Sequence, residues 1–136
     1  MRKYSKVIIL LPMLVMALML SSCRLQPIYN VKNAPVIKAV PGKKPVTENK
    51  VQRAITKAAL GLGWQVRNVR PGLIYASIEL RGHYAEVSIP YNRKSYSIMY
   101  KKSTNLLYNG TQIHRDYNGW VKNLNNAIHY NLSRGI

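Results

Sequence analysis

The sequence predicts an α+β domain in which a four-stranded antiparallel meander carries two helices on one face, in the order αββββα. Apolar residues recur with helical spacing after residue 47 and again near the C-terminus. Between these segments, apolar and polar residues alternate in short runs separated by turn residues. The chain has 136 residues, enough for one small domain. We expect a leader over residues 1–22, an extended segment over 23–46 and the folded domain over 47–136.

The first helix is expected to begin after Thr47, because a threonine hydroxyl can cap the free N–H groups of a first helical turn. Gly61 and Gly63 predict where this helix ends. Its apolar face consists of Val51, Ala54, Ile55, Ala58 and Leu62.

Four strands are expected next, and the first three cover residues 64–69, 73–80 and 83–90. A two-residue turn at Arg81-Gly82 would place apolar residues opposite one another on one face, as a half-buried hairpin requires. The expected pairs are Ile78 with Ala85, Ala76 with Val87, and Ile74 with Ile89.

The fourth strand is expected after a second turn at Asn92-Arg93, with Tyr96 opposite Ile89 and Ile98 opposite Val87. Tyr100 would then face Ala85. The other face of the meander should be mostly hydrated, and it includes Tyr75, Ser77, Glu79, Tyr84, Glu86, Ser88, Ser97 and Met99.

Residues 101–114 are polar and rich in turn residues, so we expect a loop there. Asp116 is the expected cap of the last helix. An apolar stripe at helical spacing then follows in Trp120, Val121, Leu124, Ala127, Ile128 and Leu132.

The N-terminus has the pattern of a signal peptide. Arg2, Lys3 and Lys6 precede residues 7–20, which carry no charge. These 14 residues are too few to span a bilayer comfortably, since a membrane helix needs about 20. They suit the apolar region of a signal peptide.

Leu20-Ser21-Ser22-Cys23 resembles the bacterial lipobox. The resemblance implies that the thiol of Cys23 is acylated, that cleavage falls between Ser22 and Cys23, and that the new amino terminus is acylated as well. Arg24 follows the cysteine where an aspartate would signal retention, which implies the outer membrane, facing the periplasm, if the source is Gram-negative. The alternative is an ordinary signal peptide followed by an incidental cysteine.

Residues 24–46 predict an extended, semi-rigid tether. They contain four prolines, five basic residues and no acid, and so many prolines interrupt any helical or strand period. The segment could serve as a solvated spacer or lie near anionic headgroups. As a further alternative, the apolar patch over residues 27–31 could dock on the domain.

The chain is strongly basic, with 21 Lys and Arg, four acids and a net charge of +17. Removal of Arg2, Lys3 and Lys6 leaves 18 basic and four acidic side chains, a net charge of +14. Such a charge favours contact with anionic partners such as headgroups, acidic glycans or nucleic acid. Cys23 is the only cysteine, which excludes an internal disulfide.

No catalytic or metal-binding arrangement is evident. His83, His114 and His129 lack ligand spacing with a carboxylate, so surface histidines are expected and no metal. Glu79 and Glu86 are better explained as ion-pair partners than as general bases. We therefore expect a protein that is not an enzyme and has no cofactor beyond a covalent lipid on Cys23. A hydrolase with a concealed site is the alternative.

A region rich in tyrosine and basic residues suggests a contact surface. It comprises Tyr91, Arg93, Lys94, Lys101, Lys102 and Arg115. Aromatic and cationic side chains together bind glycans, single strands or headgroups by stacking and charge. The alternative is that Tyr96 and Tyr100 belong to the core and extend only their hydroxyls to its rim.

From Pro27 onward the chain resembles a group of small, uncharacterised bacterial lipoproteins. The likeness rests on Gly63-Trp64, Pro71-Gly72, Leu80-Arg81-Gly82-His83, Ile89-Pro90-Tyr91, Ser95-Tyr96-Ser97-Ile98, Ser103-Thr104-Asn105-Leu106 and Tyr117-Asn118-Gly119-Trp120-Val121. It implies an address in the cell envelope and no mechanism. Two functions are consistent with it: a membrane-anchored, non-enzymatic module that binds or scaffolds an envelope protein, or a direct binder of lipopolysaccharide, acidic glycan or DNA.

Overall fold

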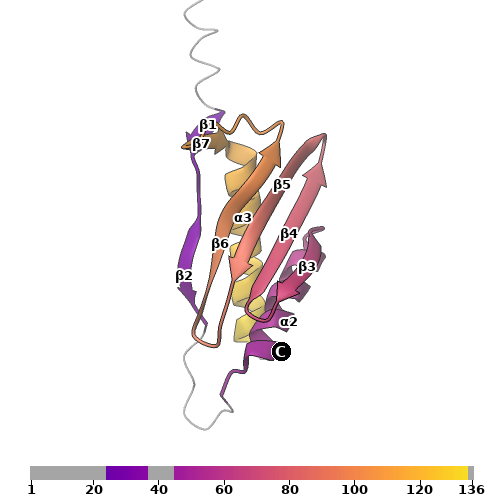
Figure 1. Cartoon of the computed structure of the whole chain (residues 1–136), viewed down its shortest axis with the longest axis vertical. Coiled ribbons are helices and arrows are strands. Elements are labelled where there is room, and N and C mark those ends of the chain that lie inside the picture. The colour runs from indigo at the N-terminus through magenta and orange to yellow at the C-terminus, as the bar shows by residue number, and fades with distance from the viewer. Residues whose placement is uncertain (1–23, 37–44, 135–136) are drawn as a thin grey trace, which may run out of the picture.

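A computed structural model describes residues 24–36 and 45–134, which form two layers (Figure 1). The expected signal peptide and Cys23 lie outside the described residues. The elements are β1 (Leu25–Pro27), β2 (Val31–Pro35), α2 (Glu48–Gly61), β3 (Gln65–Arg70), β4 (Leu73–Leu80), β5 (His83–Pro90), β6 (Ser95–Thr104), β7 (Gln112–His114) and α3 (Arg115–Ser133).

The α+β class is confirmed, although the sheet has one strand more than expected. Its order is β2-β6-β5-β4-β3, with every neighbouring pair antiparallel, and β1 and β7 form a small second sheet. Both helices lie behind the same face of the larger sheet (Figure 1). The opposite face of the sheet is therefore left without a helical cover.

The expected tether is wrong for residues 25–35, which contain two strands of the domain, β1 and β2. In β2, Val31 pairs with Ile98 and Pro35 with Ser95, while Val31, Ala34 and Val36 are buried. Proline is tolerated because these are edge strands, where one side of the backbone needs no partner. The alternative, in which residues 27–31 dock on the domain, is correct, and the fold begins near residue 24 rather than at 47.

The β4–β5 hairpin has the expected register. Ile78 pairs with Ala85, and Ile74 pairs with Ile89. The turn residues Arg81 and Gly82 both have positive φ, 54° and 75°, as a two-residue hairpin turn of type I′ requires.

The expected register of β5 and β6 is wrong. It is shifted by two residues at Val87, which pairs with Tyr100 instead of Ile98, and by three at Ala85, which pairs with Ser103 instead of Tyr100 because a bulge lies between them. The turn is longer than expected: Asn92 N–H donates to the Ser95 carbonyl, and the Asn92 side chain accepts from the amides of Lys94 and Ser95. A slip of two residues keeps each side chain on its own face, since the period of a strand is two. The apolar pattern therefore could not reveal the error.

The helices begin close to the expected positions. The Thr47 hydroxyl accepts a hydrogen bond from the amide of Lys50 at 3.3 Å, which confirms the predicted cap. The cap of α3 is His114 rather than Asp116: its ring nitrogen accepts from the amide of Asp116 at 3.2 Å. The core between helices and sheet includes Val51, Ile55, Ile74, Val87, Ile89, Ile98, Tyr117, Leu124 and Ile128.

Candidate functional site

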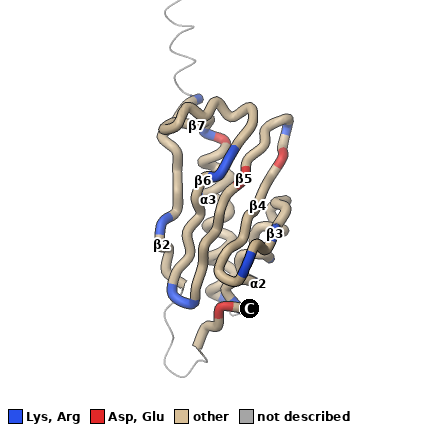
Figure 2. The backbone as a smooth tube through the Cα atoms, in the orientation of Figure 1, with Lys and Arg blue, Asp and Glu red and all other residues tan. Residues whose placement is uncertain are grey.

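The helix-free face of the sheet carries a compact group of cations, tyrosines and one carboxylate, which we call the cation–aromatic cluster. Figure 2 shows basic residues of β6 beside an acidic residue of β5 on the neighbouring strand. The members are Arg67 from β3, Tyr75 from β4, Tyr84 and Glu86 from β5, and Lys101 and Lys102 from β6.

A β-bulge brings the two lysines together. Tyr100 pairs with Val87 and Lys102 pairs with Glu86, so Lys101 is the extra residue between these pairs. In a regular strand, consecutive side chains point to opposite faces. The bulge removes this alternation locally. Both ammonium groups consequently reach the same carboxylate on the helix-free face.

Glu86 lies at the centre of the cluster and is only 7% exposed. Its Oε1 is 2.7 Å from Nζ of Lys101, and its Oε2 is 3.6 Å from Nζ of Lys102. The hydroxyl of Tyr84 donates to Oε2 at 2.8 Å. Burial by itself would raise the pKa of Glu86, but the hydrogen bonds from Lys101 and Tyr84 and the charges of both lysines outweigh it. The pKa of Glu86 is therefore lowered, and the carboxylate stays ionised.

The tyrosine rings of the cluster are in contact with cations. The guanidinium of Arg67 lies 4.9 Å and Nζ of Lys101 lies 4.6 Å from the centre of the Tyr75 ring. Lys102 lies 5.7 Å from the centre of the Tyr84 ring. A shallow hollow of about 160 Å³ adjoins these groups. Arg67, Lys101 and Lys102 outnumber the two carboxylates on this face, Glu86 and the exposed Glu79 opposite Tyr84, so the surface is positively charged, which suits an anionic partner.

The structure divides the expected contact surface. Arg93 and Lys94 are in the turn at one end of β6, and Lys101 and Lys102 are near its other end. Ser95 and Lys101 are six positions apart along β6, which corresponds to roughly 20 Å at about 3.3 Å per residue. Arg115 begins α3 on the other layer, and Tyr91 is buried. Only Lys101 and Lys102 of the six belong to the cation–aromatic cluster.

The alternative interpretation of the tyrosines is correct for Tyr96, which is 1% exposed. Its hydroxyl donates to Oδ1 of Asn125 on α3 at 2.7 Å. Burial raises the pKa values of Tyr96 and Tyr117 far above the usual range, so both remain neutral. Tyr100 is partly buried and packs edge-on against Tyr117, with ring centres 5.6 Å apart. These rings contribute to the core rather than to a binding surface.

Part of the cation–aromatic cluster could have been predicted from the sequence. The β4–β5 register was correct and already placed Tyr75, Tyr84 and Glu86 on the hydrated face. Arg67 required the pairing of β3, in which it lies opposite Tyr75. The two lysines on one face required the bulge, for which the sequence carries no recognised signal.

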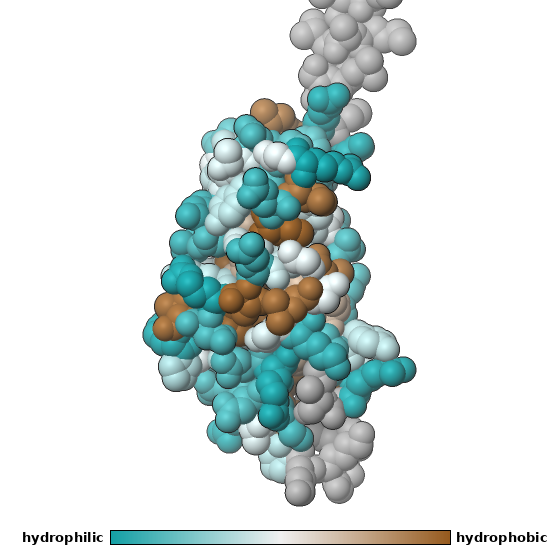
Figure 3. All heavy atoms as spheres, turned by 90° about the vertical axis from the view of Figure 1, so that its right-hand side faces the viewer, coloured by the Kyte–Doolittle hydropathy of each residue, from teal (hydrophilic) through white to brown (hydrophobic). Residues whose placement is uncertain are grey.

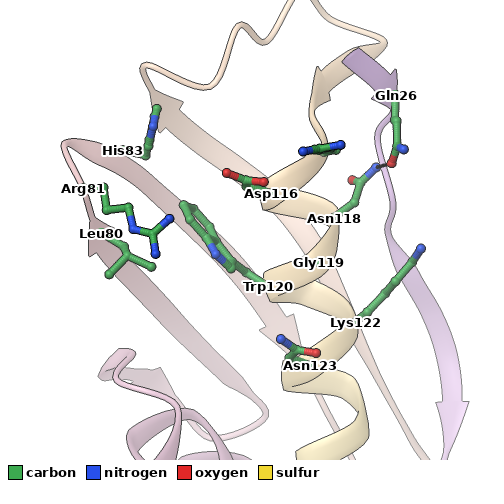
Figure 4. Close-up of a pocket in the computed structure, with 11 residues that line it drawn as sticks. Gln26, Leu80, Arg81, His83, Asp116, Asn118, Gly119, Trp120, Lys122 and Asn123 are labelled. Carbon is green, nitrogen blue, oxygen red and sulfur yellow. Dashed lines mark hydrogen bonds between the residues drawn. The ribbon is translucent and has the colours of Figure 1, made fainter. Parts of the chain in front are cut away.

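A second concave site of about 470 Å³ lies where the β4–β5 turn faces the start of α3 (Figure 4). The side chains of Arg81 and Trp120 point toward one another across it, and Asp116 points into the same space. Gln26 of β1 and Lys122 of α3 also line it. This terminal pocket is open to solvent and combines cationic, aromatic and acidic groups.

The two histidines near this pocket, His83 and His114, make contacts that hold the fold together. Nδ1 of His83 lies 2.7 Å from the carbonyl oxygen of Asn105, and its ring stacks on that of His114 with centres 6.0 Å apart. His114 caps α3. Within residues 24–36 and 45–134, no three His, Cys, Asp or Glu residues are grouped as metal ligands would be.

Exposed apolar side chains gather on the side formed by α2 and β3, as Figure 3 shows. They include Leu60, Leu62 and Val69, which are 58%, 40% and 39% exposed. β3 is also an edge strand of the sheet. None of the helices in the described part of the chain has the length and apolar character needed to cross a bilayer.

The fold and the cluster define a small α+β protein with a basic, aromatic surface on the helix-free face of an antiparallel sheet. No known family model and no curated protein sequence matches this chain.

Proposed function

We propose that this protein is a lipid-anchored, non-enzymatic binding module of the bacterial cell envelope, held in the outer membrane on the periplasmic side. The observation that carries the proposal is the sequence Leu20-Ser21-Ser22-Cys23 after a basic start and an uncharged stretch. The resemblance to small, uncharacterised bacterial lipoproteins that the sequence suggests would imply the same address. The lipid would be covalent on Cys23, with no other cofactor.

The position of the first strand fits an anchor at this cysteine. β1 begins at Leu25, and the amide of Arg115 donates to the carbonyl of Arg24 at 2.8 Å. An acylated Cys23 would therefore hold the domain directly at the bilayer instead of on the long tether expected from the sequence. Several acyl chains anchor a protein stably, because each buried methylene contributes about 0.8 kcal/mol.

Replacing Cys23 by serine tests the anchor. The wild-type protein, expressed in a Gram-negative host, is expected in the outer-membrane fraction with an N-terminal peptide that starts at residue 23 and carries lipid. The variant Cys23→Ser lacks the thiol that accepts the lipid. Its mass should therefore not include the lipid, and the variant should be absent from the outer-membrane fraction. Fractionation and intact-mass spectrometry measure both effects.

Ser21→Ala is the matched control, because it keeps a small residue in the lipobox and should remain lipidated. A wild-type protein that retains Met1 or carries a free sulfhydryl at Cys23 would contradict the proposal.

The cation–aromatic cluster favours an anionic partner over an uncharged one. Lys101 and Lys102 contact the buried carboxylate of Glu86, and Arg67 lies over the ring of Tyr75, which Lys101 also contacts. An acidic glycan offers charges for the cations and sugar faces for the rings. We therefore propose an acidic envelope polymer as the partner of this face; an envelope protein is the alternative.

The double variant Arg67→Gln with Lys102→Gln tests this partner, with heparin as a soluble acidic glycan. Each cation near an anionic surface contributes about 1 kcal/mol, so the loss of two should weaken binding roughly 30-fold at low salt. Lys101 is kept because it is the closest partner of Glu86. Binding is measured by calorimetry at about 50 and 200 mM salt, between which charge-driven affinity should fall steeply.

Arg93→Gln with Lys94→Gln removes the same charge at the far end of β6 and is the matched control. Equal losses in the two double variants would show that net charge alone determines binding and would remove the cluster as its site. Affinity that is indifferent to salt would remove the acidic polymer as the partner.

A further inference from the structure

The end of the molecule at which the described chain begins, at Arg24, is built from segments far apart in the sequence. In Figure 1 this end contains β1, β7, the β6–β7 loop and the β4–β5 turn. β1 pairs with β7. The Asn105 side chain donates to the carbonyl of Gly82 at 2.9 Å, which ties the β6–β7 loop to the β4–β5 turn. These segments form one continuous surface around Arg24, which we call the anchor end.

Apolar side chains are displayed on the anchor end instead of being buried. Leu107 and Tyr108 of the β6–β7 loop are 60% and 40% exposed, and Leu80 beside the β4–β5 turn is 44% exposed. Leu107 also has a φ of +55°, a conformation that bulky residues rarely adopt. The fold thus holds a leucine outward at the cost of local strain.

Basic side chains accompany these apolar groups. Arg24, Arg81 and Arg115 are all exposed and belong to the same end of the molecule. Two acids also belong to this end: the exposed Glu79 precedes Leu80, and Asp116 has an oxygen 3.5 Å from Nδ1 of His114. Leucine and tyrosine flanked by arginine are typical of surfaces that enter the headgroup region of a bilayer.

We propose that the anchor end is a membrane-docking surface: Leu107 and Tyr108 insert into the headgroup region, and Arg24, Arg81 and Arg115 contact anionic lipid headgroups. The inference rests on the proposed lipid anchor. Cys23 is bonded to Arg24, whose carbonyl is held by Arg115, so acyl chains at Cys23 would bring this end of the fold to the bilayer. The long axis of the sheet would then point away from the membrane surface. The β5–β6 turn, which contains Arg93 and Lys94, would lie at the end farthest from the bilayer (Figures 1 and 2).

The chemistry of the anchor makes a site-specific test possible. Acylation consumes the only cysteine of the chain, so an introduced cysteine is the single free thiol. We would introduce Leu107→Cys, Tyr108→Cys or, at the distal turn, Arg93→Cys into the full chain and purify each variant from membranes. The thiol is labelled with an environment-sensitive fluorophore. The protein is then placed in vesicles of phosphatidylethanolamine and phosphatidylglycerol, with and without brominated acyl chains.

Fluorophores at positions 107 and 108 should emit at shorter wavelength than the one at 93. Brominated chains should quench them at least about twofold more strongly, because interfacial groups lie about 5–10 Å into the headgroup boundary. Equal, water-like emission at all three positions in a lipidated protein would overturn the docking surface and leave the anchor intact. Strong quenching at all three would also overturn it, because the molecule would then lie flat.

The same samples separate the two proposals. A count of one reactive thiol per labelled variant shows that Cys23 is blocked, as the anchor requires. Two reactive thiols would overturn the lipid anchor, and the docking inference with it. Melting curves of the three variants serve as the folding check. Leu107→Ser provides a second measurement: it should dissociate more readily from vesicles in mild detergent than Leu60→Ser, the same change at a leucine that is 58% exposed on α2.

Discussion

Replacing Asn118 by alanine is expected to lower the free energy of unfolding by about 2–4 kcal/mol, since each buried polar group left without a partner costs about 1–3 kcal/mol. Asn118 is 4% exposed on α3. Its Oδ1 accepts from the amide of Tyr29 at 2.9 Å, and its Nδ2 donates to the carbonyl of Pro27 at 2.9 Å. Alanine would leave both backbone groups unpaired.

The effect should be concentrated in the N-terminal segment. Asn118 joins the link between β1 and β2 to the helix layer, so its loss should speed hydrogen exchange at Tyr29 and Val31 more than at Ile89 in the central strand. Urea unfolding measures the global change. Asn126→Ala, at an exposed position of α3, is the control and should change stability by no more than about 0.5 kcal/mol.

An effect below about 0.5 kcal/mol for Asn118→Ala, within the range of ordinary surface substitutions, would show that this segment is held by its strand pairing alone.

Replacing Glu86 by glutamine is expected to lower the free energy of unfolding by about 1–3 kcal/mol at pH 7, because a buried ionic network loses its central charge. Lys101 and Lys102 would then repel one another beside a neutral amide. The side chain of Lys101 is 33% exposed and can recover part of its hydration, which keeps the cost below that of a fully buried pair.

The effect of Glu86→Gln should depend on pH in a defined direction. The pKa of Glu86 in the folded protein is lowered from the ordinary value of 4.5. A carboxylate with a lowered pKa stabilises the fold above its unfolded pKa, and this contribution is lost as pH falls through the folded pKa. The wild type and the variant should therefore differ fully at pH 7 and converge in acid, below the folded pKa.

Urea unfolding at several pH values measures this difference. Glu79→Gln is the matched control, because Glu79 is exposed on the next strand. A Glu86→Gln difference that stayed constant down to pH 3 would mean that the ionised carboxylate contributes nothing to stability.

The central hairpin could be derived from the sequence because its information is local. Alternation over residues 73–80 and 83–90 identifies the faces, and Arg81-Gly82 determines the loop length. Together these determine the register of every pair between β4 and β5. Thr47 likewise marked the start of α2, since a cap acts within a single turn.

The N-terminal strands were missed because their stabilising contacts are distant in the chain. Pro27 and Pro35 argue against a regular element when only neighbours are considered. The structure places these prolines in edge strands. The segment contacts Ile98 on β6 and Asn118 on α3. Hydrogen bonds that span 89 or 91 residues leave no local trace.

By itself the sequence determined the α+β class, the position of both helices and the faces of the central strands, because hydrophobic period and turn chemistry act over a few residues. Only the tertiary structure decided that residues 25–35 belong to the domain and that Lys101 and Lys102 share the carboxylate of Glu86. It also separated Arg93 and Lys94 from them. The physical reason is that edge pairing, bulges and buried polar contacts are selected by the free energy of the whole packed domain, in which partners far apart in sequence meet.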